Sequence, residues 1–177
     1  DLSNGNYHLI EKKVVIEGQK TAYFSEKFLE ITVPVTTKEQ IKEIKKTVTH
    51  IAKKHDEEPY KALATTQQAI FHQLEEQDEI DAAAIFDKVF EEKPLAREAA
   101  QLAITEERVP EKIAVTNVPK YERKYSKQKF KLDNGIEITI PSEIYENKEM
   151  VEFINNPDGS VSVLIKNIES ILNKFNA

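Results

Sequence analysis

The sequence predicts an α+β fold, with a strand-containing N-terminal segment, a central helical bundle of about four helices, and C-terminal β-hairpins with a closing helix. Two observations support this prediction. In the middle of the chain apolar residues recur at the spacing of a helix face, and towards the C-terminus they alternate with polar residues as on a strand. Runs of helix separated from runs of strand are typical of the α+β class. We therefore expect three regions, at residues 1–37, 38–110 and 111–177.

The N-terminal region is expected to contain two strands. Residues 14–16 form a short β-branched run, and residues 23–33 mix aromatic with β-branched side chains. The chain starts at Asp1, without an initiator methionine, in a stretch that reads like the middle of a domain. We therefore expect residues 1–37 to be the strand-containing end of a preceding, truncated domain.

The central region carries four signals for the start of a helix. Thr36 and Glu39 have the spacing of a capping box, which satisfies the free amides of a first turn. Pro59 and Pro94 suit the first turn of a helix, and Asp81 suits a cap position. Apolar side chains at helical spacing follow each signal, which predicts four successive helices.

A β-hairpin is expected after the helices, in the stretch "KYERKYSKQKFKLDNGIEITIP" at residues 120–141. A three-residue loop at residues 133–135 would pair Leu132 with Ile136 and would keep the apolar side chains on one face. A two-residue loop would instead mix the two faces. We therefore predict the longer loop, with Gly135 at the position that needs a positive φ.

A second hairpin and a short helix are expected to complete the chain. The apolar runs "MVEFI" and "SVSVLI" flank "NNPDGS", whose composition is typical of a turn. Residues 167–177 then place Ile168, Ile171, Leu172 and Phe175 at helical spacing. This spacing predicts the closing helix.

The composition excludes several classes of site. The chain has no cysteine, so disulfides, thiolate metal sites and cysteine nucleophiles are excluded. His50 and His55 are five residues apart on a predicted helix and would point in different directions, unlike a chelating pair. No catalytic motif and no apolar run of membrane-spanning length is present. We expect no enzyme activity, cofactor, metal, membrane partner or small-molecule substrate.

Charge is distributed unevenly along an acidic chain, whose formal net charge is −6. Residues 38–55 and 120–131 are rich in lysine and arginine, whereas residues 75–92 are strongly acidic. Local fields, more than net charge, decide whether a polyanion binds. The two basic stretches are therefore the candidate contacts with nucleic acid.

The candidate contacts form a row on the first hairpin and a patch on the first helix. Cations at alternate positions of one strand lie about 7 Å apart, a spacing that can follow a phosphate backbone. Tyr121 and Tyr125 would stack on bases or pack against the core. The alternative for the cations is a solvated face, since edge strands use lysine against aggregation. The row comprises Lys120, Arg123, Lys124, Lys127, Lys129 and Lys131, and the patch comprises Lys42, Lys45, Lys46 and Lys53.

The C-terminal residues carry a family resemblance. The segment "FKLDNGIEITIPSEIYENKEMVEFINNPDGSVSVLIKNI", residues 130–168, resembles the C-terminal portion of the bacterial thirty-seven-kilodalton nucleoid-associated protein family. The shared pattern is a glycine turn, an alternating strand, a short helical spacer, an aromatic strand and a closing helix. The resemblance implies a cytoplasmic, nucleoid-located protein that associates with DNA and has no catalytic residues. Family members are longer, so the chain is expected to be a C-terminal fragment.

Two hypotheses follow. In the first, the fragment binds DNA mainly through phosphates and with little sequence specificity, with RNA as an open alternative partner. In the second, it is a protein-interaction or dimerisation module, forming a homodimer, and the missing N-terminal half carries the DNA contact. Salt dependence separates the two, because phosphate binding weakens steeply with salt and a packed apolar dimer does not.

Overall fold

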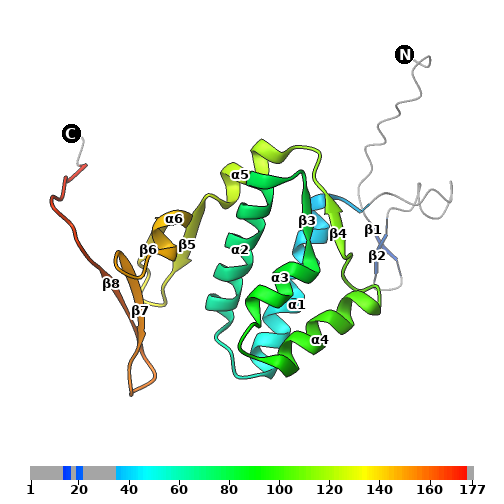
Figure 1. Cartoon of the computed structure of the whole chain (residues 1–177), viewed down its shortest axis with the longest axis horizontal. Coiled ribbons are helices and arrows are strands. Elements are labelled where there is room, and N and C mark those ends of the chain that lie inside the picture. Colours follow the sequence, from blue (N-terminus) through cyan, green and yellow to red (C-terminus); the bar gives the residue numbers. More distant parts are fainter. Residues whose placement is uncertain (1–13, 17–18, 22–34, 175–177) are drawn as a thin grey trace, which may run out of the picture. The chain divides into compact units, whose positions relative to one another are not determined.

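The computed structural model describes residues 14–16, 19–21 and 35–174 (Figure 1). The chain divides into two compact units, Asp1–Thr36 and Thr37–Ala177. In the first unit, β1 (Val14–Ile16) pairs antiparallel with β2 (Gln19–Thr21). The strand predicted at residues 14–16 is confirmed, and the one predicted at residues 23–33 lies outside the described residues. The remaining elements belong to the second unit.

Four helices form the core of the second unit and confirm the predicted central bundle. They are α1 (Thr37–Lys54), α2 (Pro59–Glu76), α3 (Ala82–Val89) and α4 (Pro94–Thr105), and they lie side by side (Figure 1). Each begins at or next to the signal that predicted it. Asp81, for example, caps α3, because its side chain accepts a hydrogen bond of 2.9 Å from the backbone N–H of Ala84.

The core residues follow the helical periodicity of the sequence. α1 buries Ile41, Ile44, Val48 and Ile51, and Phe86 and Phe90 are among the largest fully buried side chains. Together with buried residues of α2 and α4 they form one hydrophobic cluster. The lysines of α1 lie outside this cluster, as the amphipathic pattern predicts.

A short pair of strands packs against this core. The sequence did not predict this pair in full. β3 (Glu79–Asp81) pairs antiparallel with β4 (Lys112–Ala114), with Ile80 opposite Ile113. Both isoleucines are fully buried. β4 follows α4 in the chain. β3 escaped prediction because three residues are too few to show a period of two.

The residues before the first hairpin were expected to extend its row of cations, but they do not continue its strand. Residues Val118–Tyr125 form a helix, α5, so Lys120, Arg123 and Lys124 lie on a helix and not in a strand row. The helix starts because the Asn117 side chain accepts a hydrogen bond of 3.3 Å from the backbone N–H of Lys120 and a proline occupies the first turn.

The first hairpin confirms the predicted register. β5 (Lys127–Lys131) pairs with β6 (Glu137–Pro141), with Phe130 opposite Ile138 and Lys131 opposite Glu137. The loop has the three predicted residues, and Gly135 has a φ of 89°. A short helix, α6 (Ser142–Glu146), follows β6. Turn chemistry therefore determined which strand residues face outwards.

The second hairpin is also confirmed, whereas the closing helix is not. β7 (Val151–Asn155) pairs with β8 (Val161–Ile165). Residues 166–174, however, adopt neither helix nor strand. The apolar side chains of that segment are not packed against the described core, since Ile171 is 87% and Leu172 is 83% exposed. An isolated helix shorter than about 12–15 residues is marginal in water without such packing.

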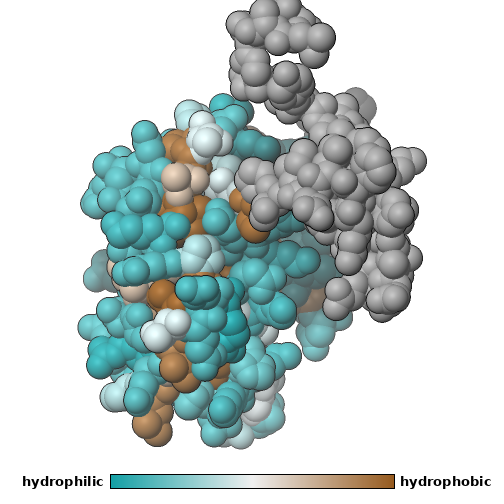
Figure 2. Space-filling model, turned by 90° about the vertical axis from the view of Figure 1, so that its right-hand side faces the viewer, coloured by the Kyte–Doolittle hydropathy of each residue, from teal (hydrophilic) through white to brown (hydrophobic). Residues whose placement is uncertain are grey.

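The surface is largely hydrophilic on the face that Figure 2 shows, and hydrophobic residues form small, separate areas there. Within the described part of the chain, none of the helices combines the length and the apolar character needed to cross a bilayer. The α+β class predicted from the sequence is confirmed. The domain boundaries predicted at residues 37 and 110 stay predictions.

Candidate nucleic-acid interface

Helix α2 positions the start of β5. The Nε2 atom of Gln67 donates hydrogen bonds to the carbonyl oxygens of Tyr125 (3.1 Å) and Lys127 (2.8 Å). Gln128, which is only 3% exposed, donates from its own Nε2 to the carbonyl oxygen of Ala64 at 2.9 Å. Buried amides of this kind fix geometry, because an unpaired one would be costly. The junction between α5 and β5 is therefore held in one orientation on α2.

The second hairpin is also attached to α2. Asn155 donates from Nδ2 to Oε2 of Glu58 at 3.2 Å and accepts from Nζ of Lys61 at 3.4 Å. The hydrogen bond from Lys61 holds the pKa of Glu58 below its usual value. The rings of Tyr60 and Phe153 lie 5.8 Å apart. α2 is thus the common support of both hairpins.

The lysines of β5 lie on its outward face, as predicted. Lys127, Lys129 and Lys131 are exposed, while Gln128 between them is buried. Their partners across the hairpin are Pro141, Thr139 and Glu137, so one carboxylate stands opposite three cations.

The cations of α5 add a second row beside this strand. Lys120 and Lys124 are four residues apart and therefore share one face of the helix. Each lies over a neighbouring ring, with Nζ at 5.9 Å from the centroid of Tyr121 and at 5.3 Å from the centroid of Tyr125. The aliphatic stems are thus held against the surface and the charged ends remain exposed.

Helix α1 brings further cations to the same place. Burial lowers the pKa of Lys124, and the positive charges of Lys45, Lys38 and Lys120 lower it further. Lys45, Lys38 and Lys120 therefore lie near enough to Lys124 for their charges to act on it. We call the surface formed by Lys38, Lys45, Lys120, Lys124, Lys129 and Lys131 the basic face, because Lys45 also lines a cleft with Lys129 and Lys131.

The basic face has few counter-charges. Of the cations predicted as contacts, Lys46 pairs with Glu43 at 3.5 Å. Within residues 35–174 the other predicted contacts form no ion pair with a carboxylate, and neither does Lys38. Some cations elsewhere are paired, for example Lys93 with Glu57 at 3.0 Å. Among residues 35–174, ion pairs therefore do not balance the repulsion on the basic face.

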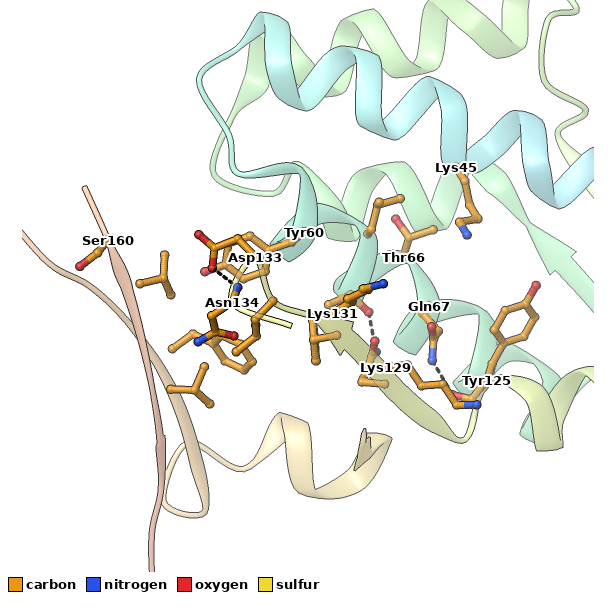
Figure 3. A pocket seen from close by; sticks show the side chains of 18 of the residues that line it. Lys45, Tyr60, Thr66, Gln67, Tyr125, Lys129, Lys131, Asp133, Asn134 and Ser160 are labelled. Atoms are coloured by element: carbon orange, nitrogen blue, oxygen red, sulfur yellow. Dashed lines mark hydrogen bonds between the residues drawn. The ribbon is translucent and has the colours of Figure 1, made fainter. Parts of the chain in front are cut away.

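A cleft opens beside the basic face. It has a volume of about 710 Å³ and lies between α2, β5 and the β7–β8 hairpin, with Lys45 on one side and Lys129 and Lys131 on the other (Figure 3). Tyr60, Phe130 and Phe153 line its wall. The cleft combines cations with aromatic rings.

Not every predicted contact belongs to this surface. Lys42, Lys46 and Lys53 are exposed on α1, but the helical period turns them about 60–100° from Lys45 around the axis. Arg123 and Lys127 are exposed next to the basic face. The structure thus brings Lys45 of the helix patch to the hairpin row. Lys42, Lys46 and Lys53 lie beside it.

Sequence reasoning missed Lys38 as a candidate contact and left the role of Tyr125 undecided. Lys38 was counted in the charge of its helix but not among the contacts, and its seven-residue spacing from Lys45 was the signal that placed both on one face. Tyr125 is 7% exposed and belongs to the hydrophobic cluster. Burial raises the pKa of Tyr125 to about 12. Tyr125 is therefore a packing residue and not a stacking platform.

No group of three or more metal-ligating side chains comes together among the described residues. The chemistry that this surface offers is the binding of anions and of aromatic groups.

A family model described as the nucleoid-associated protein YejK, NA37, matches residues 1–173. No curated protein and no solved structure matches the chain.

Proposed function

Because the chain belongs to the NA37 family of nucleoid-associated proteins, we propose that it binds DNA through the phosphates, with little sequence specificity and without enzyme activity. The basic face is the proposed contact. The observation that carries the proposal is the gathering of exposed lysines from α1, α5 and β5, where burial and the charges of Lys45, Lys38 and Lys120 lower the pKa of Lys124. A row of phosphates would supply the missing counter-charges. The proposed location is the nucleoid of the cytoplasm.

The geometry supports contact with the backbone and not with base edges. The cations of the basic face come from α1, α5 and β5, and lysine is a flexible point charge without the planar fork that reads guanine. α5 is short and carries its cations on one exposed side, beside a tyrosine pair. We therefore expect similar affinities for DNA duplexes of different sequence. The affinity for an RNA duplex tests whether the sugar affects binding.

The test is the binding of a fluorescent duplex to the 177-residue chain across a salt series. If all six lysines of the basic face engage phosphates, the logarithm of the affinity falls with the logarithm of the salt concentration at a slope of about −5. The triple variant Lys45→Glu, Lys124→Glu, Lys129→Glu is expected to lose most of the binding.

A control with the same change in charge keeps this result specific. Lys54, Lys88 and Lys148 are exposed and lie outside the basic face. Their replacement by glutamate should reduce affinity far less than the triple change on the basic face. Equal losses in the two variants, or no binding of the unchanged chain at low salt, would contradict the proposal and move the DNA contact away from the basic face.

A second candidate function is dimerisation through the C-terminus. Ile165 is 52% and Ile168 is 53% exposed, and Ile171 and Leu172 are almost fully exposed. Among the described strands, β8 pairs with β7 alone, so its other edge is open to a strand of a second copy in a two-fold antiparallel arrangement. Sedimentation should show a dimer that Ile171→Glu with Leu172→Glu dissociates. The control pair, Leu95→Glu with Leu102→Glu on α4, should leave it intact.

A further inference from the structure

The cleft beside the basic face has the size and lining of a ligand site. Its volume of about 710 Å³ falls within the range of roughly 300–1,000 Å³ typical of small-molecule sites. Its walls come from elements far apart in the sequence, among them α2, β5 and β8. The hydrogen bonds of Gln67, Gln128 and Asn155 hold these elements together. The cleft is therefore part of the fixed architecture of the unit.

One wall of the cleft is aromatic. Phe130 and Phe153 have ring centroids 5.1 Å apart, and Tyr60 lies 5.8 Å from Phe153. All three rings line the cleft and are only half-buried, so part of their surface stays open. Open aromatic surface in a cleft favours a flat, unsaturated ring as the ligand, because stacking on such side chains is favourable for every base.

Cations line the cleft as well, with Lys45 on one side and Lys129 and Lys131 on the other (Figure 3). Lys45, Lys129 and Lys131 line it without an ion pair in the described part of the chain, and Asp133 is the carboxylate beside them. The Asp133 carboxylate already accepts a hydrogen bond of 2.8 Å from the backbone N–H of Asn134. Three ammonium groups against one carboxylate favour an anionic ligand, and phosphate oxygens suit lysine.

We propose that the cleft binds an unpaired nucleotide, with its base against the wall of Phe130 and Phe153 and its phosphate at Lys45, Lys129 and Lys131. In a duplex the bases are stacked on one another and present only their edges, so a base reaches the wall only when it is unpaired. The nucleotide comes either from single-stranded DNA or from the free pool. In the first case the inference rests on the proposed DNA-binding function.

The experiment uses the full chain with a fluorescent reporter in the cleft. The protein has no tryptophan, so a single introduced indole reports its own surroundings. Val161 lines the cleft and is exposed, which makes Val161→Trp a tolerable reporter. Leu102→Trp on α4 is the control reporter, because Leu102 is exposed and lies outside the cleft. The probes are thymidine monophosphate, an oligo(dT) of about twelve nucleotides and a duplex of the same length.

Oligo(dT) should quench the fluorescence of Val161→Trp saturably and leave that of Leu102→Trp unchanged. Quenching by thymidine monophosphate as well assigns the cleft to a free nucleotide, and quenching by oligo(dT) alone assigns it to a single strand. The duplex should not quench the cleft reporter. Quenching of neither reporter by either unpaired probe, or equal quenching of both reporters, overturns the inference.

Matched lysine variants locate the phosphate. In the Val161→Trp background, Lys45→Gln and Lys129→Gln should each weaken binding of the unpaired probe by about fivefold to tenfold. Lys42→Gln and Lys127→Gln remove the same charge from the same two elements outside the cleft, and should weaken it less than about twofold. Equal effects in the two pairs overturn the inference.

The results also separate this inference from the proposed function. Salt-sensitive duplex binding, without quenching of the Val161→Trp reporter by the unpaired probes, would support the proposed function and reject the nucleotide site. Quenching by thymidine monophosphate without any duplex binding would keep the site and reject the proposed function.

Discussion

Lys124 is the residue at which the charges of α1 and α5 meet. Its pKa is lowered by burial and by three neighbouring lysines, so the folded protein holds this proton less tightly than the unfolded chain does. A base with a lowered pKa destabilises the fold while it is charged, and this cost fades as the pH rises towards its ordinary value of 10.5. At neutral pH the charged Lys124 therefore reduces the stability of the fold.

We predict that Lys124→Gln increases the free energy of unfolding at neutral pH and low salt, and at the same time weakens duplex binding. The gain is small, about 0.3 kcal/mol, because the side chain is exposed and water screens its charge. Urea unfolding at low and high salt measures the change, and added salt should shrink it. Lys127→Gln is the control, since Lys127 has no comparable cluster around it. A loss of stability in Lys124→Gln would contradict the repulsion.

At the level of single residues, the sequence predicted which positions are charged but not which charges meet. The outward orientation of Lys127, Lys129 and Lys131 was predictable, because it follows from the alternation of residues on the strand next to one turn. This alternation is a local property of the sequence. The meeting of Lys45 with Lys124 depends on how α1 and α5 pack, which no local pattern encodes. The aromatic wall of the cleft likewise required two hairpins to dock on α2.

Among the elements, those specified by local signals were predicted and those decided by packing were not. The first hairpin has a glycine turn and alternation on both sides, and its register was correct. The start of α5 carried a cap signal at Asn117, but the run of cations after it was interpreted as a strand. At residues 166–174 the helical spacing is present, yet the apolar side chains Ile171 and Leu172 stay exposed and are not buried in the described core.

The cap of α5 gives a prediction that links an element to binding. Asn117→Ala removes the side-chain acceptor for the N–H of Lys120 and should cost about 1 kcal/mol of stability. Because the first turn of α5 holds Lys120 in place, duplex affinity should fall as well. Thermal unfolding and duplex titration measure the two effects.

Asp81→Ala is the matched control for this prediction. It removes the cap of α3, which is similar in kind but distant from the basic face along the chain. It should reduce stability by a similar amount, about 1 kcal/mol, and leave duplex affinity unchanged. Equal losses of affinity in the two variants would show that α5 has no special part in binding.

On the scale of the whole molecule, the basic face is compatible with an acidic chain because the charges are segregated. Residues 75–92 hold many of the carboxylates, and they belong to the end of α2, to β3 and to the region of α3. The basic face draws on α1, α5 and β5. Since the Debye length is about 8 Å at physiological salt, a phosphate on the basic face is affected mainly by the cations near it. Net charge is then a poor guide to binding.

The final prediction concerns the independence of the second unit. Every lysine of the basic face and every member of the described hydrophobic cluster lies between Thr37 and Ala177. A chain of residues 35–177, which keeps Thr36 ahead of α1, should therefore unfold in one cooperative transition and should retain the duplex affinity and salt dependence of the full chain within about twofold. Calorimetry and the duplex titration check this. Cooperative unfolding with lost affinity would place an essential DNA contact in residues 1–34, whereas lost cooperativity would show that the first unit completes the fold.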